Sequence, residues 1–183
     1  FFDNSLMKRS NWLWIIGGAL IIGYSLLRFA GEKAHAMSYV SSVMYYTGIA
    51  IELTAILSDK GKNNTIAYLS GCLALAVLII PMALPFSPWI FSIKSLVSVV
   101  TYATLAIIAK KMYKEYKWVQ ALGTAFIIVF AVSMGVGIIG NLLFFAIENQ
   151  NVIDFIKGFV NVTGTAEKLL AGAMFIFIGK IKK

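Results

Sequence analysis

The chain has 183 residues, of which 60% are apolar and only 13% are charged. An ordinary soluble domain carries about 25% charged residues, so this composition excludes a soluble globular protein and favours an integral membrane protein. The net charge of +8 comes from basic residues at the ends of apolar segments. Because these residues form no continuous basic face, the charge does not indicate nucleic-acid binding.

Six apolar segments follow one another, and a bilayer-spanning helix needs roughly 20 such residues. The first segment lacks the small-residue cleavage site of a signal peptide, so we expect it to be a retained span. No linker divides the chain, and we treat residues 1–183 as one domain. The predicted fold class is an all-α bundle of six transmembrane helices, with helices over about residues 11–29, 37–57, 65–84, 89–109, 118–147 and 154–179.

The orientation follows from the basic residues of the connections, because Lys and Arg are enriched in cytoplasmic loops. Six spans place both termini and the loops at 58–64 and 110–117 on one side of the membrane. That side carries most of the basic residues, whereas the opposite side has Arg28, Lys33 and Lys157. The sequence therefore predicts a multi-pass protein with both termini in the cytoplasm.

Four ionisable residues lie inside the predicted spans: Glu52, Lys94, Glu167 and Lys168. A charge near the bilayer centre costs at least about 2.5 kcal/mol unless it has a partner or water, and such residues commonly mark ion paths. Glu52 shares a helix face with small and polar residues spaced three or four apart, namely Ser38, Ser41, Tyr45, Gly48 and Ala55. We expect this face, together with the helix faces that carry Lys94, Glu167 and Lys168, to line a polar interior of the bundle. The alternative is that the charges form salt bridges that only fix the helix packing.

Neutral polar residues extend this interior, and we expect Tyr45, Asn141 and Asn161 to supply hydrogen bonds within it. Gly135, Gly137 and Gly140 match a G-X-G-X-X-G pattern. A dinucleotide site needs a strand before these glycines and a helix starting at them, whereas here they lie deep inside a predicted span. We therefore interpret them as small residues that let another helix approach closely.

The single cysteine, Cys72, and the single histidine, His35, limit the available chemistry. They exclude an intrachain disulfide, a Cys-rich zinc site and bis-histidine haem ligation within the chain. No nucleophile has an activating base nearby in the sequence, and no acidic cluster is suited to metal binding. We expect no cofactor and no metal, and the sequence gives no support for an enzyme.

The leading hypothesis is a transporter or channel-type protein for a small solute or ion, or the membrane-embedded solute-binding component of a transporter. The main alternative is a non-catalytic subunit of a larger membrane complex, with other subunits or further copies of the chain as partners in the bilayer. A third hypothesis is a membrane enzyme acting on lipid or quinone. We expect a transporter to have a water-accessible cavity reaching Glu52, and a subunit to turn a small-residue face outward.

Overall fold

The computed structural model describes residues 2–30, 35–59, 88–143, 146 and 149–181, with side chains described at 11–30, 40–59, 100–140, 146 and 149–181. Every regular element in these ranges is an α-helix, in agreement with the predicted all-α class. The helices are α1 (Phe2–Phe29), α2 (His35–Ser58), α4 (Pro88–Met112), α5 (Lys117–Leu143) and α6 (Gln150–Ile181). The predicted helix at 65–84 lies outside the described residues, so a total of six helices stays a prediction.

The helices differ from their predicted bounds mainly where polar residues continue a turn that hydropathy alone would end. α6 begins at Gln150, rather than near residue 154, because Asn149 caps it. The side-chain oxygen of Asn149 accepts a hydrogen bond from the backbone N–H of Asn151 at 3.0 Å, the usual geometry of an N-cap. A bond of 2.9 Å from Gln150 to Asp154 supports the same first turn. α1 likewise begins earlier than predicted, at Phe2.

A short turn joins α4 to α5 and makes them antiparallel neighbours. α4 begins with Pro88, at the first helical position, where proline is well tolerated because its missing N–H has no partner in the helix. At the C-terminal end of α4, the backbone carbonyl of Lys110 accepts a hydrogen bond of 2.8 Å from the side chain of Gln120. This bond ties the start of α5 to the end of α4.

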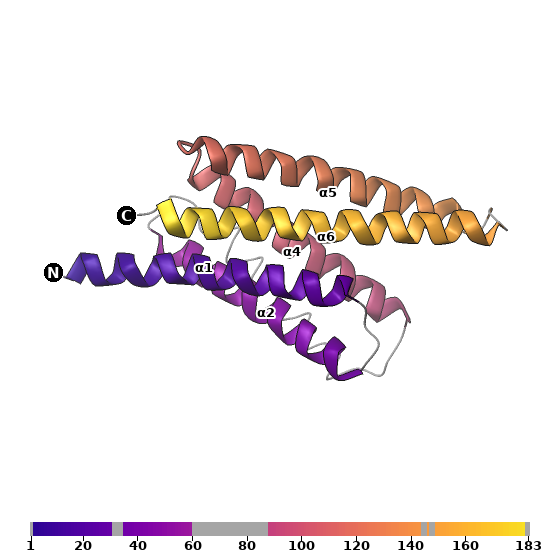
Figure 1. Cartoon of the computed structure of the whole chain (residues 1–183), viewed down its shortest axis with the longest axis horizontal. Helices are drawn as coiled ribbons and strands as arrows, with labels where there is room; N and C mark the ends of the chain where they lie inside the picture. Colours follow the sequence, from indigo (N-terminus) through magenta and orange to yellow (C-terminus); the bar gives the residue numbers. More distant parts are fainter. Residues whose placement is uncertain (1, 31–34, 60–87, 144–145, 147–148, 182–183) are drawn as a thin grey trace.

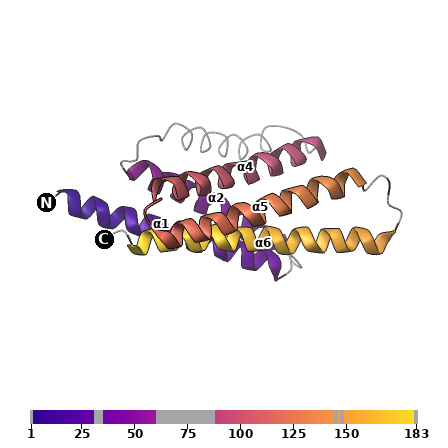
Figure 2. The same cartoon turned by 90° about the horizontal axis from the view of Figure 1, so that it is seen from above.

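α1 and α6 make the most extensive helix contact in the described part of the bundle. α1 lies between α2 and α6, and α6 in turn packs along α5, whereas α4 touches α2, α5 and α6 more lightly. Figure 1 shows α1, α5 and α6 running side by side, and Figure 2 shows α4 lying off the layer that α5 and α6 form. The start of α1 and the end of α6 meet at one end of the bundle, where the carbonyl oxygen of Asn11 lies against Gly179.

Glycine allows α1 and α6 to approach until their backbones touch. A Cβ atom added to Gly18 would lie 2.6 Å from the carbonyl oxygen of Gly172, and one added to Gly172 would lie 2.9 Å from the carbonyl oxygen of Gly18. Both distances are far below van der Waals contact, so neither position accepts a larger residue without movement of the backbone. Close approach through small residues is the usual way in which helices associate in a membrane, where lipid offers no hydrophobic driving force.

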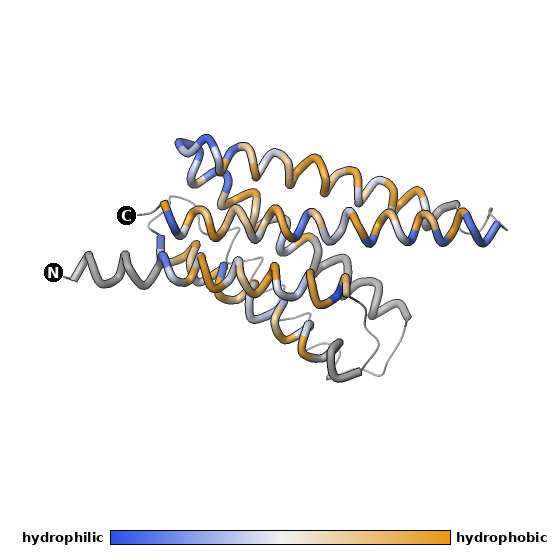
Figure 3. Tube along the Cα trace, in the orientation of Figure 1, coloured by the Kyte–Doolittle hydropathy of each residue, from blue (hydrophilic) through white to orange (hydrophobic). Residues whose placement is uncertain are grey.

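Four of the described helices are long and apolar enough to cross a membrane: Asn11–Phe29, Val40–Ser58, Lys117–Gly140 and Gln150–Ile181. They correspond to the first, second, fifth and sixth predicted spans, which makes the chain a multi-pass membrane protein by length and composition. Figure 3 shows the same pattern along α5, whose middle is hydrophobic while the turn before it is hydrophilic. The cytoplasmic location of the termini stays a prediction.

Candidate functional site

Glu52 lies at the contact between α2 and α1, and its side chain is completely buried, with 0% exposure. The absence of a side chain at Gly17 makes room for it, because a Cβ atom there would lie 2.8 Å from the carboxyl carbon of Glu52. Neither carboxyl oxygen has a hydrogen bond of ordinary geometry. The polar group beside the carboxyl is the backbone amide of Gly18. Glu52 therefore occupies a notch in α1 without a charged partner among the described side chains.

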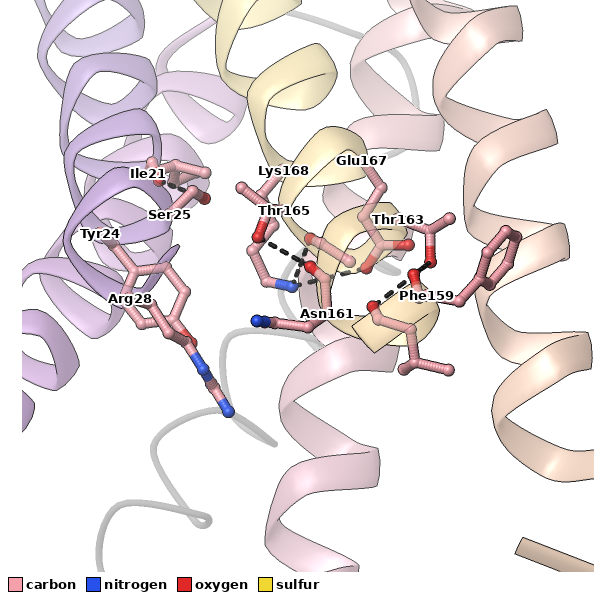
Figure 4. Close-up of polar contacts among 12 residues, drawn as sticks. Ile21, Tyr24, Ser25, Arg28, Phe159, Asn161, Thr163, Thr165, Glu167 and Lys168 are labelled. Carbon is pink, nitrogen blue, oxygen red and sulfur yellow. Dashed lines mark hydrogen bonds and ion pairs between the residues drawn. The ribbon is translucent and has the colours of Figure 1, made fainter. Parts of the chain in front are cut away.

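Glu167 and Lys168 form a second polar cluster, near the middle of α6 (Figure 4). The Lys168 ammonium lies 3.5 Å from Oε1 of Glu167 and donates a hydrogen bond of 3.0 Å to the backbone carbonyl of Gly164. The side chains are 15% exposed for Lys168 and 4% for Glu167. The second carboxyl oxygen of Glu167 has no hydrogen-bond partner. The pair is thus largely buried, and one oxygen of the Glu167 carboxyl accepts no hydrogen bond.

Tyr102 of α4 connects this pair to the aromatic core. The Lys168 ammonium lies 5.4 Å from the centre of the Tyr102 ring, and such cation–π contacts are worth about 0.5–2 kcal/mol. The Tyr102 hydroxyl lies beside the Glu167 carboxyl, although no hydrogen bond of ordinary geometry joins them. On its other side, the Tyr102 ring contacts Tyr45 of α2, with ring centres 6.3 Å apart.

A second cation approaches the cluster from α1. Arg28 donates a hydrogen bond of 2.6 Å to the Tyr24 hydroxyl, one turn earlier on the same helix. Figure 4 shows both side chains beside α6, near Lys168, and the positive charges of Arg28 and Lys168 are close enough to repel each other. Tyr24 packs on Tyr45 with ring centres 4.6 Å apart. Two cations and one carboxylate therefore share this region, where α1, α4 and α6 meet.

The structure brings only some of the predicted interior residues together. Tyr45 is buried at 5% exposure and contacts Tyr24 and Tyr102, whereas Asn161 lies on an exposed part of α6. Within the described residues, no interaction connects Glu52 with Glu167 or Lys168, so Glu52 and Glu167 belong to separate places in the bundle.

Two further predicted interior residues, and the three glycines predicted to pack against another helix, lie on α4 and α5. Lys94 lies on α4 and Asn141 on α5, but their side chains are outside the described set. A Cβ atom added to Gly140 would lie 2.6 Å from Ile156 of α6, so Gly140 serves the contact between these two helices. Gly135 and Gly137 have nothing within 4 Å of such an atom in the described part of the chain.

Sequence reasoning missed Asp59, which ties several helices together at one end of the bundle. Its carboxylate accepts a hydrogen bond of 2.9 Å from the Trp14 indole of α1, and another from the Tyr113 hydroxyl in the turn after α4. The Trp14 ring lies 5.7 Å from the rings of both Tyr113 and Phe175. Burial is the main cause that raises the pKa of Tyr113 above its ordinary value.

The sequence does contain a signal for Asp59. Tyr45, Glu52 and Asp59 are spaced seven residues apart, which returns each to nearly the same face of a helix. All three are buried, at 5%, 0% and 6% exposure. The predicted end of this helix at Leu57 assigned Asp59 to a loop, but its backbone N–H still donates a helical hydrogen bond to Ala55.

The described residues contain no group of three or more His, Cys, Asp or Glu side chains that could hold a metal ion. Comparisons with protein-family models, with curated proteins and with solved structures give no significant match to this chain. The described helices define the class as an all-α protein, with four apolar helices long enough to span a bilayer.

Proposed function

We propose that this chain is a transport or channel-type membrane protein that moves a small solute or ion through the interior of its bundle. The observation that carries the proposal is the buried pair of Glu167 and Lys168 in the middle of the candidate span of α6, with Tyr102 of α4 against it. Burying charges in a bilayer is costly, and a pair that served only helix packing would be expected to satisfy its acceptors within the protein. Glu167 keeps one oxygen without a partner.

The chemistry of the cluster suits a small charged or polar solute. The ion pair between Lys168 and Glu167 is long, at 3.5 Å, compared with about 2.7–2.9 Å for a tight charge-assisted hydrogen bond. Each group can therefore exchange its partner for a solute group of opposite charge without breaking a strong bond. Arg28 supplies a second positive charge nearby, and the tyrosine rings supply apolar walls with polar edges.

Flux measurements on reconstituted protein test this proposal directly. The full chain is inserted into liposomes, and currents are recorded after jumps in H⁺, K⁺ or Cl⁻ concentration. We expect the wild type to pass at least one of these ions faster than empty liposomes, and Glu167→Gln and Lys168→Met to lower that flux at least tenfold.

Glu115→Gln and Lys180→Met are matched controls, because these side chains are exposed near the ends of the helices. Their flux should equal that of the wild type. The proposal fails if folded wild-type protein passes none of the three ions, or if the interior variants behave like the controls.

A second candidate function, a non-catalytic subunit of a membrane complex, is favoured by the open face of α5. Only 17% of its apolar middle is buried within the described bundle, and Gly135 and Gly137 have free space beside them in the same described part of the chain. A subunit that packs this face on another chain should lose its partner when Gly135 is changed to Leu, while its own fold is unaffected. Native mass spectrometry of the complex extracted from the membrane measures that loss.

A further inference from the structure

The buried carboxyl of Glu52 needs a positive charge to neutralise it, and the structure limits what that charge can be. An ionised carboxylate in a low-dielectric interior is strongly unfavourable unless it is paired and hydrogen-bonded. Glu52 is 0% exposed, and neither of its oxygens has a hydrogen bond of ordinary geometry, although the backbone amide of Gly18 lies beside the carboxyl. The neutralising partner must therefore come from the surrounding helices, from a bound cation or from a proton.

Among the side chains that the structure describes, none on the neighbouring helices supplies it. α1 and α4 are the elements packed on α2. On α1, the described ionisable side chains are Arg28 and Tyr24, which form a hydrogen bond with each other. On α4, Tyr102 lies beside Glu167, and the two lysines of the last turn, Lys110 and Lys111, do not contact Glu52. On α2 itself, Tyr45 and Tyr46 pack on other rings. None of these groups forms an ion pair with Glu52.

A metal cation is also a poor match for this notch. Na⁺, Mg²⁺ and Ca²⁺ are held by several oxygen ligands at once. The groups beside the Glu52 carboxyl are the Cα of Gly17 and the backbone amide of Gly18, and an amide N–H has no lone pair to offer a metal. No metal-binding group of three side chains occurs in the described part of the chain. A proton needs none of these ligands, since it binds to a single carboxyl oxygen.

We infer that Glu52 is a proton-binding site, and that the proton is the ion whose movement this chain couples to the solute site of α6. The second part rests on the proposed transport function, whereas the first part stands on the geometry of Glu52 alone. In the closed arrangement the O–H bond of the carboxylic acid is intact. When the contact between α1 and α2 opens, that bond breaks, the proton passes to water, and a carboxylate remains.

The face of α2 provides groups on either side of Glu52 for this transfer. Asp59 and Tyr45 each lie seven residues away, about 10 Å along the axis at a rise of about 1.5 Å per residue. Asp59 lies at the end of the bundle where Trp14 and Tyr113 bond it, and Tyr45 leads through Tyr102 to Glu167. Titratable groups thus occur on either side of Glu52, but at about 10 Å each is beyond hydrogen-bond reach, so a proton passes between them only through water.

Infrared difference spectroscopy tests the protonation of Glu52. The full chain is produced with ¹³C-labelled glutamate carboxyl groups and reconstituted in lipid at neutral pH. We expect a carbonyl stretching band of a protonated carboxylic acid that shifts with the label. This band should be absent from Glu52→Gln and present in the matched variant Glu115→Gln, because Glu115 is exposed in the turn between α4 and α5.

Gly17→Ala gives an independent readout if Glu52→Gln does not fold. The added Cβ would overlap Oε1 of Glu52 and lie 2.8 Å from its carboxyl carbon, so the carboxyl must leave the notch and the band should shift or disappear. The inference is overturned if the unmodified labelled chain shows only carboxylate bands at neutral pH, or if the acid band survives in Glu52→Gln.

Proton uptake by liposomes, followed with a trapped pH-sensitive dye, separates this inference from the proposed function. Proton uptake that disappears in Glu52→Gln supports both. An acid band assigned to Glu52 without any ion flux supports the proton site and contradicts transport. Flux that is unchanged in Glu52→Gln supports transport and overturns the assignment of Glu52 as its proton site.

Discussion

Individual side chains at the helix contacts decide how this bundle is held together. In a membrane, apolar contact alone does little to distinguish one helix arrangement from another, so hydrogen bonds and close backbone approach carry much of the specificity. Asp59 is the clearest case, because one buried carboxylate accepts bonds from α1 and from the turn after α4. Glu52, by contrast, is buried without such bonds. Two acids on one helix face therefore have different roles.

Replacing Asp59 with alanine should destabilise the protein by about 1–3 kcal/mol, because it leaves the Trp14 indole without its acceptor in a buried place. Ser58→Ala is the control, since Ser58 is exposed on the same turn and bonds only the backbone of its own helix. The free energy of unfolding in mixed micelles measures both effects. Equal stability of the two variants would show that the Asp59 contacts contribute nothing.

At the scale of the helices, α1 carries glycines on the faces it turns to α2 and α6. Gly17 receives the Glu52 side chain, while Gly18 touches the backbone of Gly172. On α5, Gly135 and Gly137 have open space beside them in the described part of the chain, whereas Gly140 packs on Ile156 of α6. Glycine therefore serves close packing at some positions and leaves open space at others.

Substituting alanine for glycine should lower stability where the glycine is closely packed and not where it has open space beside it. Gly18→Ala places a Cβ 2.6 Å from the carbonyl oxygen of Gly172, and overpacking of this kind typically costs about 1–3 kcal/mol. Gly158→Ala is the matched control, because nothing lies within 4 Å of its added Cβ. There the higher helix propensity of alanine should leave stability unchanged or raise it by up to about 1 kcal/mol. Thermal unfolding in detergent compares the two, and similar losses would contradict the role of the α1–α6 contact.

At the scale of the whole molecule, the start of α1 and the end of α6 lie at the same end of the bundle (Figure 1). The contact of Gly179 with Asn11 fixes this arrangement, and it requires the chain to cross the membrane an even number of times if α1 and α6 both span it. The prediction of six spans meets that requirement. The excess of basic residues on the side of the termini predicts that this side faces the cytoplasm.

Protease-sensitive tags test this topology. Tags fused to each end of the chain should both be protected in intact cells, whereas a tag inserted at Ala146, exposed between α5 and α6, should be cleaved. Cleavage of both terminal tags, with protection of the inserted one, would reverse the orientation. Cleavage of only one terminal tag would contradict an even number of spans.

The amino-acid sequence by itself determined the membrane class, because runs of about 20 apolar residues have few other stable environments. It also determined the helical periodicity that puts Tyr45, Glu52 and Asp59 on one face, although hydropathy ended that helix too early to recognise Asp59. Only the tertiary structure decided which groups meet. Glycine at 18 and 172 lets two backbones touch, Lys168 lies over Tyr102, and Glu52 lies in the notch at Gly17 away from the other charges. The physical reason is that hydropathy depends on composition along the chain, whereas pairing depends on the angle and depth at which helices pack.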